Sequence, residues 1–178
     1  MDPITHTCSG ILIGQGLRPL PAVRRKTLLV AGIAGFAPDF DSVSYLWGSD
    51  AFFRLHHTYT HTLVGIIALA LVLAGIESRW LKDFSFARLF GLNFAGCTIH
   101  LCGDLIALWP LRLLWPFSEH NFTLEWTRDF DYVVLVVVVV ATGLSETDGF
   151  QRHAPWIITG AVLLLAAYFI FIPGWGGA

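Results

Sequence analysis

Long apolar stretches separated by short polar segments dominate the pattern along this chain. Three of them, residues 62–76, 86–109 and 155–172, approach the roughly 20 apolar residues that a helix needs to cross a membrane. A fourth, residues 132–144, contains the run Val-Val-Leu-Val-Val-Val-Val-Val. A lone strand in lipid would leave its backbone groups without hydrogen-bond partners, so we expect this run to be helical as well.

Two shorter apolar segments, residues 9–17 and 27–37, precede these four. The Pro19-Leu20-Pro21 turn between them predicts a helical hairpin, and Pro38 is expected to end the second helix because proline disfavours the α conformation of the preceding residue. The pattern therefore predicts an all-α, polytopic membrane protein of about six helices in a single domain over residues 1–178. The first residues lack the positive and apolar regions of a signal peptide, so we expect them in the mature protein.

Composition supports the membrane class and excludes others. The chain is 55% hydrophobic and 13% charged, about half the charge content of a soluble domain. A formal net charge of −2 offers no basic field, so we expect no nucleic-acid partner. Three cysteines (Cys8, Cys97 and Cys102) are an odd number without a zinc-binding spacing, so neither a disulfide framework nor a thiolate metal site is predicted.

The basic residues predict the orientation in the membrane. If residues 18–26 face the cytoplasm, alternation of the helices places eight of the eleven basic residues on that side. The remaining three are Arg54, Arg112 and Arg128. Segments 38–61 and 110–131 then lie at the outer face, together with most of the unusual polar residues.

Ionisable side chains in or beside membrane spans are costly, so their positions are informative. The candidate metal ligands are His6, Asp39, Asp41, His56, His61, His100 and Asp104. His100 and Asp104 are four residues apart on one helix face and can share a metal ion, or bond to each other as a link between helices. Asp39 and Asp41 can both turn into one pocket, or lie in a solvated loop that caps a helix.

The spacing of His56 and His61 does not place both on one face of a continuous helix. We expect His61 in the first turn of a span with His56 in the loop before it, either as ligands or as an interfacial histidine-rich loop. No function is predicted for Cys8, His57, His120 or His153. Asp129 and Asp131 lie just before a predicted span, and the favourable position of a carboxylate at a helix start is enough to explain them.

All the candidate ligands are predicted to lie at the outer face of the membrane. Polar residues placed at random along the chain would not gather on one side in this way. Mixed imidazole and carboxylate ligands predict zinc, with manganese or iron as other possibilities. Of Asp39 and Asp41, the one that is not a ligand is expected to accept a proton from a metal-bound water or to orient a ligand histidine.

Five elements in order resemble the YdjM-like family of inner-membrane, metal-dependent hydrolases. They are Met-Asp-Pro-Ile-Thr-His-Thr at the start, Pro38-Asp39-Phe40-Asp41, His56-x4-His61 with Thr60, His100-x3-Asp104, and Leu114-Trp115-Pro116-Phe117-Ser118. The resemblance extends over about residues 1–131. One departure is visible, because this chain reads His56-His57-Thr58 where the family usually reads His-Arg-Gly.

The family itself is distantly similar to the zinc-dependent phospholipase C and single-strand nuclease superfamily. That resemblance implies a site of one or two metal ions held by His6, Asp39 or Asp41, His61 or His56, His100 and Asp104, with Asp104 bridging. It implies hydrolysis of a phosphoester in a lipid or another membrane-proximal substrate. Arg54 and Arg112 are candidates for binding the substrate phosphate or, alternatively, for anchoring to headgroups.

Two other classes of function would use the same residues. A metal transporter or sensor would need the same ligands, although it should place ionisable groups near the midplane on several spans, and here only His100 lies moderately deep. A non-catalytic membrane partner protein would use the histidines and aspartates for helix packing alone.

Overall fold

The computed structural model describes residues 1–171, and this part of the chain is all-helical, as the sequence predicts. The α-helices are α1 (Pro3–Gly16), α2 (Pro21–Phe36), α3 (Ser49–Leu55), α4 (Leu63–Glu77), α5 (Phe86–Ile106), α6 (Tyr132–Glu146) and α7 (Ala154–Phe171). Two 3-10 helices, η1 (Ala37–Trp47) and η2 (Gln151–His153), complete the order.

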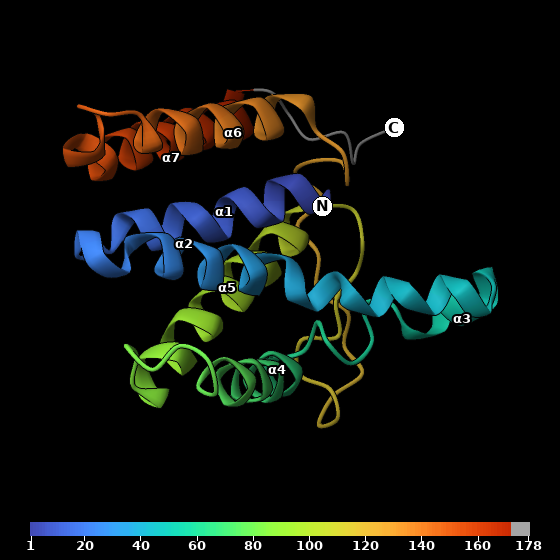
Figure 1. Cartoon of the computed structure of the whole chain (residues 1–178). Helices are drawn as coiled ribbons and strands as arrows, with labels where there is room; N and C mark the ends of the chain where they lie inside the picture. Colours follow the sequence, from blue (N-terminus) through green and yellow to red (C-terminus); the bar gives the residue numbers. More distant parts are fainter. Residues whose placement is uncertain (172–178) are drawn as a thin grey trace.

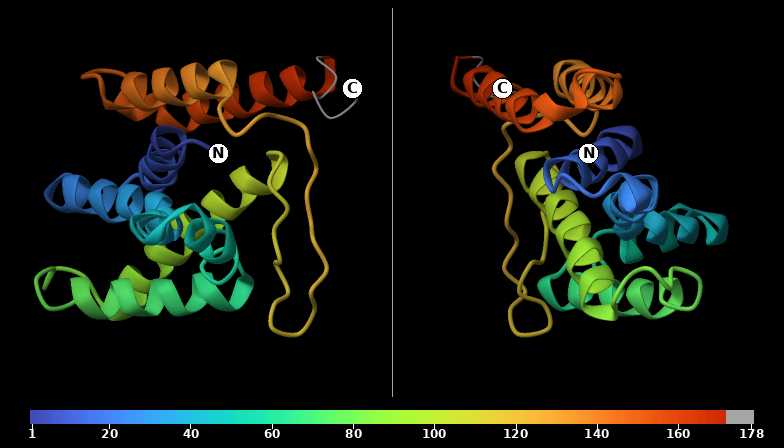
Figure 2. Two further views of the ribbon diagram at one scale, coloured as in Figure 1. Left: turned by 90° about the vertical axis from the view of Figure 1, so that its right-hand side faces the viewer. Right: turned by 60° about the vertical axis from the view of Figure 1, so that its left-hand side comes forward.

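The helices form three layers (Figure 1). The hairpin of α6 and α7 lies on one side, α1 and α2 lie in the middle, and α4 lies on the other side, while α5 crosses between the middle layer and α4. The turns α1–α2, α4–α5 and α6–α7 meet at one end of the bundle, and η1 with α3 projects from the opposite end. Figure 2 shows the long segment between α5 and α6 running along the outside of these layers.

The first two helices begin earlier than the apolar pattern predicts. Asp2 accepts hydrogen bonds from the backbone N–H groups of Ile4 and Thr5, and Pro3 occupies the first turn of α1. Pro21 likewise starts α2, which therefore includes three basic residues at its beginning. Segments 9–17 and 27–37 are thus the apolar parts of two longer helices.

The segment after Pro38 is more ordered than expected. The α-helix does end at Phe36, but the chain continues as η1 to Trp47 and then as α3. Pro38 lies in the first turn of η1, where its missing N–H group costs no hydrogen bond. The prediction of about six helices therefore omitted α3 and η1.

Within residues 1–171, two helices have the length and composition to cross a membrane, Phe86–Ile106 and Gln151–Phe171. The apolar helices Leu63–Glu77 and Tyr132–Glu146 have 15 residues each, fewer than the roughly 20 that a straight crossing needs. Of the four longer spans that the sequence predicts, two are therefore long enough to cross a membrane. The last residue of the predicted segment 155–172 lies outside the described residues.

Glycines allow the central helices to approach closely. A Cβ atom on Gly10 would lie 2.2 Å from the Ala31 carbonyl oxygen, and one on Gly35 would lie 2.5 Å from the His6 carbonyl oxygen. These positions bring the backbones of α1 and α2 into contact, as small residues do between membrane helices. His6 lies one turn before Gly10 on α1, so this crossing fixes the position of its side chain.

The segment between α5 and α6 holds the end of α5 in place. The N–H groups of Leu124, Trp126 and Thr127 donate to the carbonyl oxygens of Leu105 and Ile106. The last carbonyls of a helix have no partner within the helix, so these bonds satisfy groups that would otherwise be unpaired. The end of α5 that carries Asp104 is thereby fixed.

Replacing Gly10 with alanine should destabilise the protein, because the added methyl group overlaps the Ala31 carbonyl. We expect a loss of about 1–3 kcal/mol in the free energy of unfolding and a lower melting temperature in detergent. Gly75→Ala on α4 is the matched control, since its Cβ would meet nothing within 4 Å. Equal melting temperatures for the two variants would contradict the proposed role of the α1–α2 crossing.

Candidate metal centre

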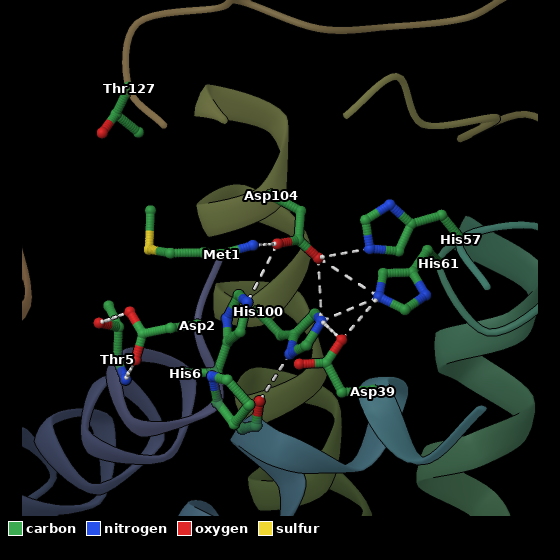
Figure 3. A network of polar contacts seen from close by, with 12 residues as sticks. Met1, Asp2, Thr5, His6, Asp39, His57, His61, His100, Asp104 and Thr127 are labelled. Carbon is green, nitrogen blue, oxygen red and sulfur yellow. Dashed lines mark hydrogen bonds and ion pairs between the residues drawn. The ribbon is translucent and has the colours of Figure 1, made fainter. Parts of the chain in front are cut away.

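Six polar side chains from four parts of the chain meet where α1 begins and α5 ends (Figure 3). His6 comes from α1, Asp39 from η1, His57 and His61 from the segment before α4, and His100 and Asp104 from α5. All six are buried, and His61, His100 and Asp104 have no exposed surface. We call these six residues the donor cluster.

The nitrogen and oxygen atoms at its centre have the spacing of metal ligands. His61 Nε2 and His100 Nε2 are 3.0 Å apart, and each lies 3.5 Å from Asp39 Oδ1. Asp104 Oδ2 lies 3.3 Å from His61 Nε2 and 3.0 Å from His100 Nε2. Ligands placed tetrahedrally around zinc are about 3.3 Å apart, since each lies about 2.0–2.1 Å from the ion.

The hydrogen bond of His100 determines which of its nitrogens is free. His100 Nδ1 donates to the carbonyl oxygen of Gly35 over 2.7 Å. A carbonyl can only accept, so Nδ1 carries the hydrogen and Nε2 of the neutral ring has a bare lone pair. That lone pair faces the centre of the cluster, the orientation that a bond at the other ring nitrogen gives to a metal-binding histidine.

His61 is oriented in the same way by Thr60 and Asp41. The Thr60 hydroxyl donates to Asp41 Oδ2 over 2.5 Å, so its oxygen can accept from His61 Nδ1, which lies 2.9 Å away. Asp41 Oδ2 itself lies 3.5 Å from His61 Nδ1. With Nδ1 as the donor, Nε2 of a neutral His61 also presents a lone pair to the centre of the cluster.

When both rings are neutral, the atoms that face the centre of the donor cluster are therefore all hydrogen-bond acceptors, and no hydrogen lies between them. Asp104 Oδ2 is buried and has no hydrogen-bond partner, although it faces both bare imidazole nitrogens. Lone pairs at these distances repel unless a cation lies among them, and the cation is either a proton on a ring or a metal ion. The donor set thus fits a metal ion.

The second oxygen of Asp104 makes different contacts. Asp104 Oδ1 lies 3.0 Å from His6 Nε2 and is paired with the amino group of Met1. The His6 ring stacks on the His100 ring with a centroid separation of 3.7 Å. Within 4.8 Å of one another, the potential ligand atoms form two groups that share Asp39: Asp39, His57, His61 and Asp104 in one, and His6, Asp39 and His100 in the other.

His57 is the member of this cluster that the sequence reasoning missed. Its Nε2 lies 3.9 Å from Asp104 Oδ2, and its ring packs against His61 and Trp109. The backbone at His57 has φ 64°, a left-handed conformation that is uncommon outside glycine. This turn of the backbone buries a residue that the pattern placed in an exposed loop, and no spacing rule would have identified it.

Asp41 and His56 lie beside the donor cluster rather than in it. His56 Nδ1 is 2.6 Å from Asp41 Oδ1, and the other oxygen of Asp41 contacts Thr60 and His61. Both side chains are partly exposed, at 12% for His56 and 11% for Asp41. Of the two predicted carboxylates, Asp39 faces the centre and Asp41 orients two histidine rings.

The two predicted substrate arginines lie outside the cluster. Arg54 and Arg112 are exposed, and within residues 1–171 neither forms a hydrogen bond or ion pair with the donor cluster. Arg54 Nε instead donates to the carbonyl oxygen of Asp50. Asp131 caps α6 by accepting from the N–H groups of Val133 and Val134, as expected for a carboxylate at a helix start.

The carboxylates around His61 set its protonation in the absence of a metal. Burial opposes a charge on this ring, but Asp104, Asp39 and Asp41 outweigh it and raise the pKa of His61 to about 10. His57 behaves in the opposite way, because burial and the repulsion from His61 lower its pKa to about 3. The metal-free cluster thus binds one proton on His61 and keeps His57 neutral.

The sequence comparisons identify related proteins. A family model described as "YdjM inner membrane protein" matches residues 1–176. The uncharacterized protein YfhP of Bacillus subtilis (strain 168) is 23% identical over 156 residues, which are 84% of this chain and 47% of that protein. The chain thus spans about half the length of this curated relative. No solved structure matches the chain.

Binding of a divalent metal ion near neutral pH should release about one proton. His61, with a pKa of about 10, is protonated at pH 7, and its Nε2 must lose the hydrogen to become a ligand. Calorimetric titration of chelator-treated protein with Zn²⁺, in buffers of different ionisation enthalpy, measures this proton. His120→Gln, at an exposed position, should release the same number. Zinc binding without proton release would contradict the protonated state of His61.

Proposed function

The chain belongs to the YdjM inner membrane protein family, and from this premise we propose that it is a metal-dependent hydrolase. Its substrate is the phosphoester of a lipid or of another membrane-proximal molecule. The reaction is the one expected from the resemblance to the phospholipase C and single-strand nuclease superfamily. The proposal concerns this chain alone, because YfhP is about twice as long.

One observation carries the proposal: potential ligand atoms of two histidines and two aspartates converge in a buried site of a chain with only 13% charged residues. Burying two carboxylates this closely is strongly unfavourable unless a cation compensates them. Mixed imidazole and carboxylate donors favour zinc, with manganese and iron next. His61, His100, Asp39 and Asp104 would hold the first ion, and His6 and His57 extend the set toward a second.

A bound zinc ion supplies hydroxide near neutral pH, because it can lower the pKa of a coordinated water to about 7. The chain orients its own ligands through Gly35 and Asp41, which fix the rings of His100 and His61. Asp41 also holds Nδ1 of His56, which leaves the other nitrogen of that partly exposed ring for proton transfer. We assign His56 the role of carrying a proton to or from the substrate.

The surroundings of the cluster suit an amphiphilic substrate. Trp109 lies against His56 and His57, and Trp115 packs against Tyr59 in the same region. Tryptophan is enriched at membrane interfaces because its ring is apolar and its N–H group polar. Eight basic residues lie in the turns at the opposite end of the bundle or in the helix ends that adjoin them, which favours an outer-face location for the cluster.

The purified protein should contain a transition metal and hydrolyse a phosphoester. We expect at least one metal ion per chain by elemental analysis, and metal-dependent activity against a panel of phospholipids and soluble phosphoesters. His100→Ala combined with Asp104→Ala should lose both the metal and the activity. Asp50→Asn, at an exposed site on α3, should retain both.

The outcomes of this experiment separate the alternatives. Activity that survives the double substitution would refute the hydrolase. Stoichiometric metal without hydrolysis of any substrate would favour a transporter or sensor. Absence of metal, with stability unchanged by a chelator, would favour a packing role for the same side chains.

Replacing Asp41 with asparagine should weaken metal binding without removing a ligand. Residues that orient a ligand histidine typically contribute 10–100-fold to metal affinity, and we expect a loss in that range, about tenfold or more. Competition with a chromophoric chelator measures the affinity, with Asp50→Asn as the charge-matched control. An affinity equal to that of the unaltered protein would show that Asp41 does not orient His61.

A further inference from the structure

A pocket lined by arginines lies at the end of α1 opposite to the donor cluster. Its volume is about 310 Å³, and its lining includes Gln15, Arg18, Arg24, Gln151 and Arg152. Arg18 lies in the turn between α1 and α2, Arg24 lies at the start of α2, and Arg152 lies in η2 before α7. Two hairpins that are distant in sequence therefore build one basic pocket.

The charges of this pocket are only partly compensated. Arg24 donates to both oxygens of Glu146 over 2.5 and 2.7 Å, and Gln15 donates to the same carboxylate over 2.6 Å. This network fixes the Arg24 guanidinium. Within residues 1–171, neither Arg18 nor Arg152 pairs with a carboxylate. Arg152 Nε donates to the ring of its neighbour His153 over 3.0 Å, which leaves the charge of the guanidinium uncompensated. The pocket thus presents two cationic groups without a carboxylate partner beside a third, Arg24, that is held by Glu146.

An apolar groove of about 410 Å³ lies between α1 and α7, with Ile99 of α5 and Val138 of α6 also in its lining. Leu12 and Ile13 of α1 line it together with Leu17, which directly follows this helix, and Ile158, Val162 and Leu165 line it from α7. Leu17 directly precedes Arg18 in the chain, so the groove reaches the α1–α2 turn that also lines the basic pocket. Its lining from Ile158 to Leu165 extends about 10 Å along the helix, within the roughly 15 Å of one leaflet.

The exposure of α7 indicates that the groove opens toward lipid. Only 6% of the apolar stretch that ends in α7 is buried within the protein. A membrane helix exposed in this way contacts acyl chains. The structure therefore combines a site for an anion with an adjoining site for a hydrocarbon chain.

We propose that Arg18, Arg24 and Arg152 bind the phosphate of an anionic phospholipid whose acyl chain occupies the groove between α1 and α7. Guanidinium groups match phosphate oxygens in geometry, and basic pockets between membrane helices bind anionic headgroups. The site lies at the other end of α1 from the donor cluster and does not depend on the proposed hydrolysis.

The test measures binding of phosphatidylglycerol to the purified full chain in neutral detergent, by native mass spectrometry and by the shift in melting temperature. Arg18→Gln with Arg152→Gln should weaken binding about 30-fold, taking the usual contribution of each basic residue. Arg25→Gln with Arg79→Gln removes the same charge at exposed positions of the same end of the bundle. That control should bind within about threefold of the unaltered protein.

Val162→Trp tests the groove without changing any charge. Val162 is 60% exposed, so the larger ring can be accommodated without disturbing the fold, while it should block the acyl chain and weaken binding. Equal binding of phosphatidylcholine, an equal stabilisation by inorganic phosphate alone, or an equal loss in the Arg25 and Arg79 control would each overturn the proposal.

Discussion

The close approach of α1, α2 and α5 around Gly35 is the constraint on which both the fold and the donor cluster depend. The Cα atom of Gly35 lies against Gly10, and its carbonyl oxygen accepts the hydrogen bond of His100 Nδ1. The same residue therefore sets the distance between two helices and the orientation of a ring that faces the cluster centre. A side chain at this position would push α1 away and displace His6 as well.

The sequence predicts the all-helical class and the apolar segments, because a long hydrophobic run in a membrane protein can satisfy its backbone hydrogen bonds within a single helix. It does not predict where α1 and α2 begin, since Asp2 and Pro21 start helices through local hydrogen bonds and a fixed backbone angle rather than through apolar side chains. It also does not predict η1, where a proline initiates a 3-10 helix instead of ending all regular structure.

The candidate site is likewise predicted only in part from the sequence. The i, i+4 spacing of His100 and Asp104 already places both on one helix face, and the structure brings His6, Asp39 and His61 to them. Asp39 and Asp41 occupy different positions because of the path of η1. The spacing of the two residues in the sequence does not predict this path. His57 enters the cluster through a left-handed backbone conformation, and a bulky residue gives no sequence signal for that conformation.

Asp41 connects two histidines whose proposed tasks differ, since one oxygen contacts His56 and the other contacts Thr60 and His61. Energetic effects of substitutions at residues in one hydrogen-bond network are not additive. Under the proposed function, a change at position 41 would affect both metal binding by His61 and proton transfer by His56, and a further change at position 56 would have a different effect in that background. The effect of a substitution at any one of positions 41, 56 and 61 therefore depends on the residues at the other two.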